Sequence, residues 1–351
     1  MKKLEHHFRL QKIISSREKQ LDEDFPPDLL RVWTDFKTPA TIGKGGLKGE
    51  ETAKQPHNLA LVTVHGLMLQ YKHLSKPEVK KAQHAFAVNL CEHATKTSYF
   101  TYQHILHALE QPEMKKIFNN PRFTRLEFTF DCASTYMSQE MVYNLTKGFA
   151  EHISPRKFTS IRFSPQCHCH GKSNLDRRFS SLTSWKKNWE DDDFHDTILS
   201  IDDLEACYVY GLDRSNQSRV TIDHKEPLVT EISKIELKPD PKEHRPYVDL
   251  PGLKSTNSIT YITESQKLYN NVLPQVPADR GKDITSRIYD STHGKPVTEK
   301  MKNPGKKRKT IVTEAEETSP KVVESQFVNR KRFISRGGLE NYIKYELKID
   351  I

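Results

Sequence analysis

The amino-acid sequence predicts an α+β protein, with mixed helices and short strands in its N-terminal two thirds. Three patterns lead to this class. An apolar run rich in β-branched residues covers 58–70, apolar and polar residues alternate over 122–130, and helical periodicity recurs between such segments. Beyond them the pattern weakens, which predicts a disordered basic linker followed by a C-terminal strand.

The first 57 residues are expected to form a helical arm and a loop. Apolar residues keep roughly one face over 3–21, and Pro26-Pro27 then interrupts the pattern. Behind Asp28, a suitable N-cap, a helical spacing predicts a second helix with an apolar face of Leu29, Leu30, Trp33 and Phe36. Residues 37–57 lack periodicity and hold four glycines, which indicates a loop.

Residues 58–165 are predicted to follow the order β-α-α-β-α-β. The run at 58–70 is typical of a buried strand that turns at Gly66. Ser75 to Glu78 has the pattern of a capping box and predicts a helix to about residue 94, with Val79, Ala82, Phe86 and Leu90 on its apolar face. A helix over 98–111, a half-buried strand over 122–130, a helix over 138–153 capped by Ser138 and a strand over 157–165 complete the unit.

The periodicity weakens after residue 165. Residues 171–196 are polar, with two tryptophans, Trp185 and Trp189, and an acidic run at 190–193. Short strands at 197–201, 206–212, 218–223 and 228–237 suggest a small antiparallel sheet. Residues 238–257 and 274–336 have the composition of linkers. The expected organisation is therefore a helical arm and loop (1–57), an α+β association domain (58–237), a mostly disordered linker with a basic nuclear-import segment (238–340) and a C-terminal strand (341–351).

Composition indicates a soluble, intracellular, mildly basic protein. Of 351 residues, 35% are hydrophobic and 29% charged, and 55 Lys and Arg outnumber 46 Asp and Glu to give a net charge of +9. There is no run of 18 apolar residues, as a membrane-spanning helix would need, and no apolar segment of a secretory signal follows the first residues. Five cysteines, an odd number in a long chain, argue against a disulfide framework and favour a reducing compartment.

The densest cluster of chemically active side chains is Cys167-His168-Cys169-His170. It could hold zinc, with further ligands from Cys207, His195 or His224. Alternatively, His168 and His170 form the metal-binding pair of a His-hydrophobe-His DNA-nicking replication initiator. Such an enzyme holds a divalent metal and attacks the phosphodiester with a tyrosine, here Tyr208, Tyr210 or Tyr261. The remaining alternative is a polar loop in which these residues cluster by chance. Other enzyme signatures are absent, so we expect no catalytic, cofactor or metal site.

The clearest functional signal is a block of four adjacent cations, Lys306, Lys307, Arg308 and Lys309, which we call the import block. It lies in a stretch rich in Pro, Thr and Glu. Extended lysines on such a segment can reach the acidic pockets of a nuclear import receptor. The sequence therefore predicts location in the nucleus.

A second basic block, Arg330, Lys331, Arg332 and Arg336, follows in the same region. Residues 300–336 contain 11 Lys and Arg against 4 Glu, so this segment contributes 11 − 4 = +7 of the chain's +9. A segment with this charge can contact DNA backbones without reading their sequence. We therefore expect DNA as a partner of the basic segment rather than of the folded body.

Residues 57–158 resemble the larger partition protein (trans-acting factor B) of yeast two-micron-type plasmids. The match rests on the strand at 58–70 with the segment after it, and on the stretch around the Asn119-Asn120 turn that contains Phe123, Leu126, Phe128 and Cys132. The resemblance covers less than a third of the chain.

This resemblance implies a nuclear, non-enzymatic protein of plasmid partition. Members of the family associate with themselves and with a second, smaller plasmid-encoded protein, act at a plasmid stability locus with host nuclear factors, and repress plasmid transcription. The family has no catalytic residues to carry over, and neither a cofactor nor a membrane is implied. A DNA-binding or movement-type protein of a nuclear virus is a further alternative.

Overall fold

The computed structural model describes residues 2–43, 60–76, 78–92, 96–131, 133–153, 158–166, 174–191, 197–222, 227–240, 245–250, 253, 258–271 and 280–289, with side chains from residue 12 onward. The chain divides into two units, one formed by Arg9–Gly294 and the other by Met1–Phe8 with Lys295–Ile351. All contacts below lie within the first unit. The described residues confirm the predicted α+β class.

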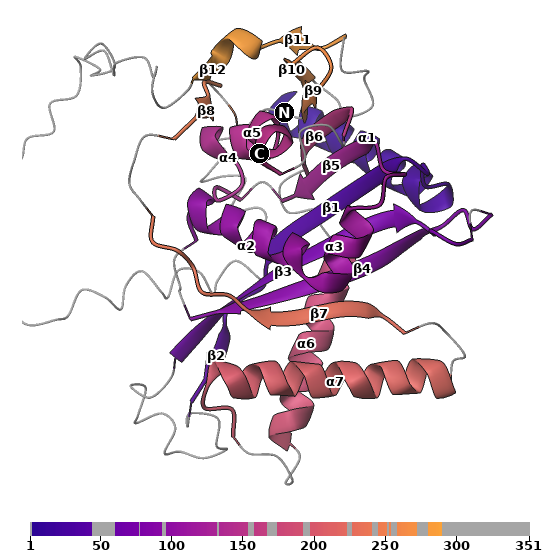
Figure 1. Ribbon diagram of the computed structural model, residues 1–351, viewed down its shortest axis with the longest axis vertical. Helices are drawn as coiled ribbons and strands as arrows, with labels where there is room; N and C mark the ends of the chain where they lie inside the picture. Colours follow the sequence, from indigo (N-terminus) through magenta and orange to yellow (C-terminus); the bar gives the residue numbers. More distant parts are fainter. Residues whose placement is uncertain are drawn as a thin grey trace, which may run out of the picture. The chain divides into compact units, whose positions relative to one another are not determined.

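A ten-stranded mixed sheet organises this unit (Figure 1). Its strand order is β11-β10-β9-β6-β5-β1-β3-β4-β7, and β2 pairs beside them with β3. The pairs β1–β5, β5–β6 and β4–β7 are parallel, whereas the other neighbours are antiparallel. The strands are β1 (Leu29–Phe36), β2 (Ala40–Ile42), β3 (Ala60–Lys72), β4 (Ala82–Cys91), β5 (Arg125–Phe130), β6 (Ser160–Pro165), β7 (Val229–Lys234), β9 (Ser258–Ile262), β10 (Lys267–Asn271) and β11 (Lys282–Asp283). A separate ladder joins β8 (Tyr247–Val248) to β12 (Ile288–Tyr289), which follows a short 3-10 turn, η5 (Thr285–Arg287).

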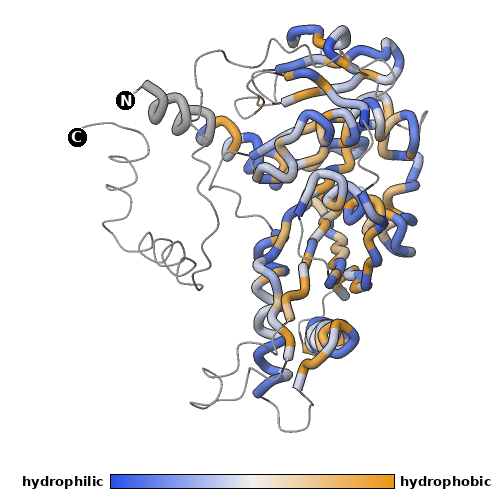
Figure 2. Tube along the Cα trace, turned by 90° about the vertical axis from the view of Figure 1, so that its left-hand side faces the viewer, coloured by the Kyte–Doolittle hydropathy of each residue, from blue (hydrophilic) through white to orange (hydrophobic). Residues whose placement is uncertain are grey.

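Helices cover both faces of the sheet. One face packs against α2 (Ser98–Glu110), α3 (Pro112–Phe118), α4 (Gln139–Asn144) and α5 (Lys147–His152). The other face packs against α6 (Asn174–Asp191) and α7 (Ile201–Thr221) along β3 and β4. Short hydrophobic and hydrophilic segments alternate along the described trace (Figure 2).

The polar half of the second face is occupied by α1 (Lys2–Glu23) through buried ion pairs. Arg17 donates to both carboxylate oxygens of Glu127 on β5 at 2.8 and 2.5 Å, and Glu18 accepts two hydrogen bonds of 2.8 Å from Arg31 on β1. Burial opposes ionisation of Glu127, but Arg17 and Arg31 outweigh it and hold the pKa of this carboxyl well below its ordinary value. These pairs fix the helix that precedes the first strand of the sheet.

Two expected helices are strands. Residues 29–36 form β1, where Leu30 and Val32 face one helical layer while Arg31 and Trp33 face the other side. Likewise, residues 82–91 form β4 rather than the end of a helix from Ser75. Both strands are buried on both faces, so the period of two is masked and apolar residues also fall at helical spacings.

The predictions after residue 165 are largely wrong. Two long helices, α6 and α7, occupy the polar segment and replace the short strands expected at 197–201, 206–212 and 218–223. Of the four expected strands only the last exists, as β7, and it pairs in parallel with β4. Residues 238–340 include β8 to β12, and β9 extends the sheet from β6, so the linker prediction fails for these described residues. The expected boundaries at 57 and 237 both fall between strands of one sheet.

Several elements are confirmed. The first helix, the strand at 60–72, the helix at 98–110 and the strands β5 and β6 lie where the sequence predicts them. The strand β3 continues through Gly66 instead of turning there, and β5 is buried on both faces rather than half-buried. Ser138 caps a helix, accepting a 3.0 Å hydrogen bond from the Met141 amide, but the expected helix is divided into α4 and α5.

Among the described residues, no helix is long and apolar enough to cross a membrane. The predicted C-terminal strand at 341–351 and most of the basic linker lie outside the described residues.

Candidate anion-binding site

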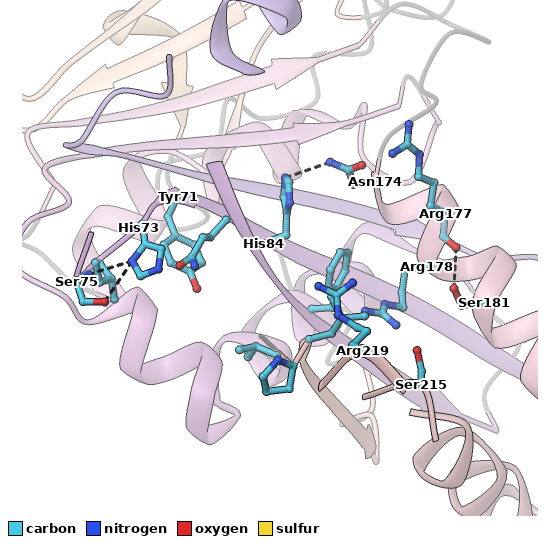
Figure 3. Close-up of a pocket in the computed structure, with 16 residues that line it drawn as sticks. Tyr71, His73, Ser75, His84, Asn174, Arg177, Arg178, Ser181, Ser215 and Arg219 are labelled. Carbon is cyan, nitrogen blue, oxygen red and sulfur yellow. Dashed lines mark hydrogen bonds between the residues drawn. The ribbon is translucent and has the colours of Figure 1, made fainter. Parts of the chain in front are cut away.

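A cavity of about 670 Å³ opens at the start of β4 where α6 and α7 pack against the sheet (Figure 3). β4 contributes His84 and Phe86, α6 contributes Arg177 and Arg178, and the last turns of α7 contribute Arg219. The loop after β3 and the start of β7 complete the wall. The cavity therefore collects side chains that are far apart in the sequence.

The charge of this cavity is strongly one-sided. Three arginines line it, Arg177, Arg178 and Arg219, and no Asp or Glu is among its described lining residues. Figure 3 shows Arg178 and Arg219 close together below His84, with Arg177 beside Asn174. Asp22, at the end of α1, is near enough for Arg177 to lower its pKa, although burial and Glu18 raise that pKa overall. The described lining is therefore cationic.

Arg178 is the most unusual of these residues because it is only 5% exposed. Its guanidinium carbon lies 4.6 Å from the Phe86 ring centroid and 5.6 Å from that of Trp185, and its Nε has no hydrogen-bond partner within the described part of the chain. Burial, followed by the charge of Arg219, lowers the pKa of Arg178 to about 10. Arg178 therefore remains a cation at neutral pH.

The sequence places Arg178 on the buried stripe of α6. The buried residues of this helix are Leu175, Arg178, Phe179 and Leu182, which share one face at spacings of three and four. An arginine inside an apolar stripe is a signal that could have indicated this site. Its neighbour Arg177 lies one position away around the helix and lines the same cavity.

His84 supplies a neutral polar group. The Nδ2 of Asn174 lies 3.1 Å from the Nε2 of His84, and the amide can donate to this nitrogen. Burial, followed by Arg177, lowers the pKa of His84 to about 4. His84 consequently does not add to the positive charge of the arginines at neutral pH.

The far wall of the cavity is held by α7. Asn216 bonds both backbone groups of Leu228, accepting from its amide at 2.8 Å and donating to its carbonyl at 3.3 Å. This clamp fixes the chain just before β7, where Pro227, Leu228 and Val229 form an apolar part of the lining. The cavity thus has a cationic side and an apolar side.

A second cluster of titratable groups lies within the core. Thr34 bonds His65 Nε2 at 2.6 Å, and the His65 and His104 rings lie 4.9 Å apart. Burial lowers the pKa of both histidines, that of His104 to about 3. The described residues include no group of three or more His, Cys, Asp or Glu side chains arranged to hold a metal. These histidines are consistent with neutral core residues.

The site residues expected from the sequence are not brought together by the described part of the chain. The import block, the second basic block, Cys167, His168, Cys169, His170, His195 and His224 all lie outside the described residues. Cys207 and Tyr208 are buried on α7, and burial raises the pKa of both groups, that of Cys207 to about 12. Tyr210 is exposed on the same helix and makes an edge-on contact with Trp189, while Tyr261 is buried in β9.

In comparisons with known proteins, no family model matches the chain, and no curated protein and no solved structure has significant similarity to it.

Proposed function

We propose that this chain is a non-enzymatic nuclear protein of plasmid partition. It associates with itself and with a second plasmid-encoded protein, acts at a plasmid stability locus together with host nuclear factors, and represses plasmid transcription. The body from α1 to β12 provides the association surfaces, and the basic segment provides nuclear entry and DNA contact.

The observation that carries this proposal is the separation of charge from the folded body. Residues 300–336 hold +7 of the net charge, so the rest of the chain carries 9 − 7 = +2. A nearly neutral body suits association with protein, and a short basic segment suits phosphate backbones and import receptors. The resemblance over residues 57–158 adds the plasmid context. Phe123, Leu126 and Phe128, which help to carry that resemblance, are buried core residues.

The cationic cavity supports binding rather than catalysis. Its described lining has three arginines and neutral polar groups, with no carboxylate to act as a base beside its histidines. The nicking alternative needs a tyrosine hydroxyl near a metal-binding histidine pair. Of its three candidate tyrosines, Tyr208 and Tyr261 are buried, which favours packing roles for both.

Plasmid retention in dividing yeast cells tests the proposal. The reporter plasmid carries this reading frame, its partner frame and the stability locus. We expect a frameshift in this chain to increase plasmid loss per division. Replacing all four residues of the import block by Gln should exclude the chain from the nucleus and cause the same loss. As a matched control, four exposed lysines of the body are replaced by Gln, Lys19, Lys115, Lys116 and Lys267.

Two outcomes would contradict the proposal. Unchanged plasmid loss after the frameshift would remove the partition function. Relaxation of supercoiled plasmid by the purified chain with Mg²⁺ or Mn²⁺, abolished in His168→Ala, would establish the nicking enzyme instead. A chain that stays nuclear without the import block would overturn the role of that block alone.

A further inference from the structure

The cavity between β4, α6 and α7 contains a buried cation, Arg178, and no carboxylate among the described lining residues balances its charge. Within the described residues, the contacts of the Arg178 guanidinium are the Phe86 and Trp185 rings. Arg219 lies close enough to disfavour the charge of Arg178 further. Taking a charged group out of water is costly unless it is paired and hydrogen-bonded. An anion in the cavity would offset this cost.

The lining contains further polar groups beside Arg178. Arg177 and Arg219 contribute guanidinium groups from two helices, and Ser215 contributes a hydroxyl. The Asn174 amide pairs with His84, and the Ser181 hydroxyl donates to the Arg177 carbonyl. Planar guanidinium groups bind phosphate oxygens in pairs, and charge-assisted hydrogen bonds are about twice as strong as neutral ones. This donor set fits a tetrahedral dianion better than a single carboxylate.

The burial of Arg178 limits what can carry the anion. Because Arg178 is only 5% exposed, a group that reaches it must be small. A DNA duplex is a broad rod whose phosphates contact protruding side chains, whereas a small ligand can be enclosed. The volume of about 670 Å³ lies within the ordinary range for small-molecule sites, and Leu74, Pro227 and Leu228 offer apolar surface for an organic group.

We propose that this cavity binds a small phosphate monoester, with the phosphate between Arg178 and Arg219 and the organic group against the apolar wall. This inference does not depend on the proposed function. It assigns a ligand to the body of the chain, and its test leaves plasmid retention unmeasured.

Calorimetric titration of the full chain tests this binding, with adenosine 5′-monophosphate as the probe. Adenosine and inorganic phosphate separate the two halves of the ligand, and potassium chloride matches the ionic strength. We expect saturable 1:1 binding of the monophosphate, weaker binding of inorganic phosphate and none of adenosine. A bound ligand should also raise the midpoint of thermal unfolding as its concentration increases.

Variants connect the binding to the cavity. Arg219→Gln should weaken binding of the monophosphate at least tenfold, and Arg178→Met should abolish it. Circular dichroism first checks that both variants fold. If Arg178→Met does not fold, Arg219→Gln alone tests the site. The matched control is Arg214→Gln, because Arg214 lies on the same helix but contacts the Tyr210 ring instead of lining the cavity.

Three results would overturn the inference. The chloride control could reproduce the stabilisation, which would indicate general screening of charge. Arg214→Gln could weaken binding as much as Arg219→Gln does. A short DNA duplex could displace the monophosphate and lose affinity in Arg219→Gln, which would make the cavity a DNA backbone site.

Discussion

Asp35 lies near the end of β1, and the folded structure opposes ionisation of its carboxyl group. Burial, followed by the charge of Asp131, raises its pKa from 3.8 to about 7, although the Phe36 amide donates a 2.7 Å hydrogen bond to it. A raised folded pKa means that the folded state binds the proton more tightly than the unfolded state. The stability from this proton is complete below about pH 4 and is lost as the pH rises through 7.

We therefore expect Asp35→Asn to be more stable than the parent at pH 8, by about 2–4 kcal/mol, since one pKa unit corresponds to about 1.4 kcal/mol. The difference should shrink toward zero at pH 4. Urea unfolding at both pH values measures it. Asp28→Asn is the control of opposite sign, because Arg125 lowers the pKa of Asp28, so this variant should lose stability at neutral pH. An Asp35→Asn variant that gains nothing at pH 8 would show that Asp35 ionises without cost.

At the scale of elements, Gly66 determines how closely α6 approaches the sheet. A Cβ at this position would lie 2.6 Å from Phe179 Cε1 and 2.8 Å from Leu175 Cδ1, both on α6. Gly66→Ala should therefore displace the helix and destabilise the chain by about 1–3 kcal/mol in urea unfolding, the usual cost of overpacking.

A double-mutant cycle can assign this loss to the contact with α6. Adding Phe179→Leu should recover part of the stability lost in Gly66→Ala. Gly211→Ala is the matched control, since its Cβ would lie 2.3 Å from Trp185 Cγ, farther along the same stripe of α6. Phe179→Leu should not rescue that variant. Equal rescue of both would mean that the cycle measures general loosening of the helix.

The elements also show why the sequence predicts only part of this fold. The sequence predicts β5 and β6 correctly because the neighbouring turns and the apolar residues both indicate a strand. It predicts a helix in place of β4 because this strand is apolar on both faces. Phe86, Val88 and Leu90 pack on one face, and Ala85 and Ala87 pack on the other. α7 is missed because β-branched and aromatic residues near its middle suggest a strand. Its N-terminal capping box of Ser200 and Asp203 was a usable signal.

The candidate site was less predictable than the elements. Its cationic groups come from α6 and from the end of α7, and its histidine comes from β4, so only the tertiary fold brings them together. With β4 taken as a helix and α7 as short strands, their side chains could not be placed on a common wall. The buried arginine in the stripe of α6 was visible in the sequence, but only after α6 itself was recognised.

At the scale of the whole molecule, the position of charge predicts where DNA binds. If the second basic block contacts the backbone, each neutralised phosphate contributes about 0.9 to the slope of log affinity against log salt concentration. Replacing the four cations of this block by Gln should reduce the magnitude of that slope by about 3–4 on a duplex of arbitrary sequence. The thermal unfolding of the body should not change, since the block lies outside Arg9–Gly294.

Fluorescence anisotropy over a series of salt concentrations measures this slope for the full chain. The matched control is the variant in which the body lysines Lys19, Lys115, Lys116 and Lys267 become Gln, which removes the same charge from positions that already pair with carboxylates. We expect its slope to equal that of the parent. If the control loses as much slope as the basic-block variant, the body lysines also contact DNA. The position of net charge would then not predict which region of the chain binds DNA.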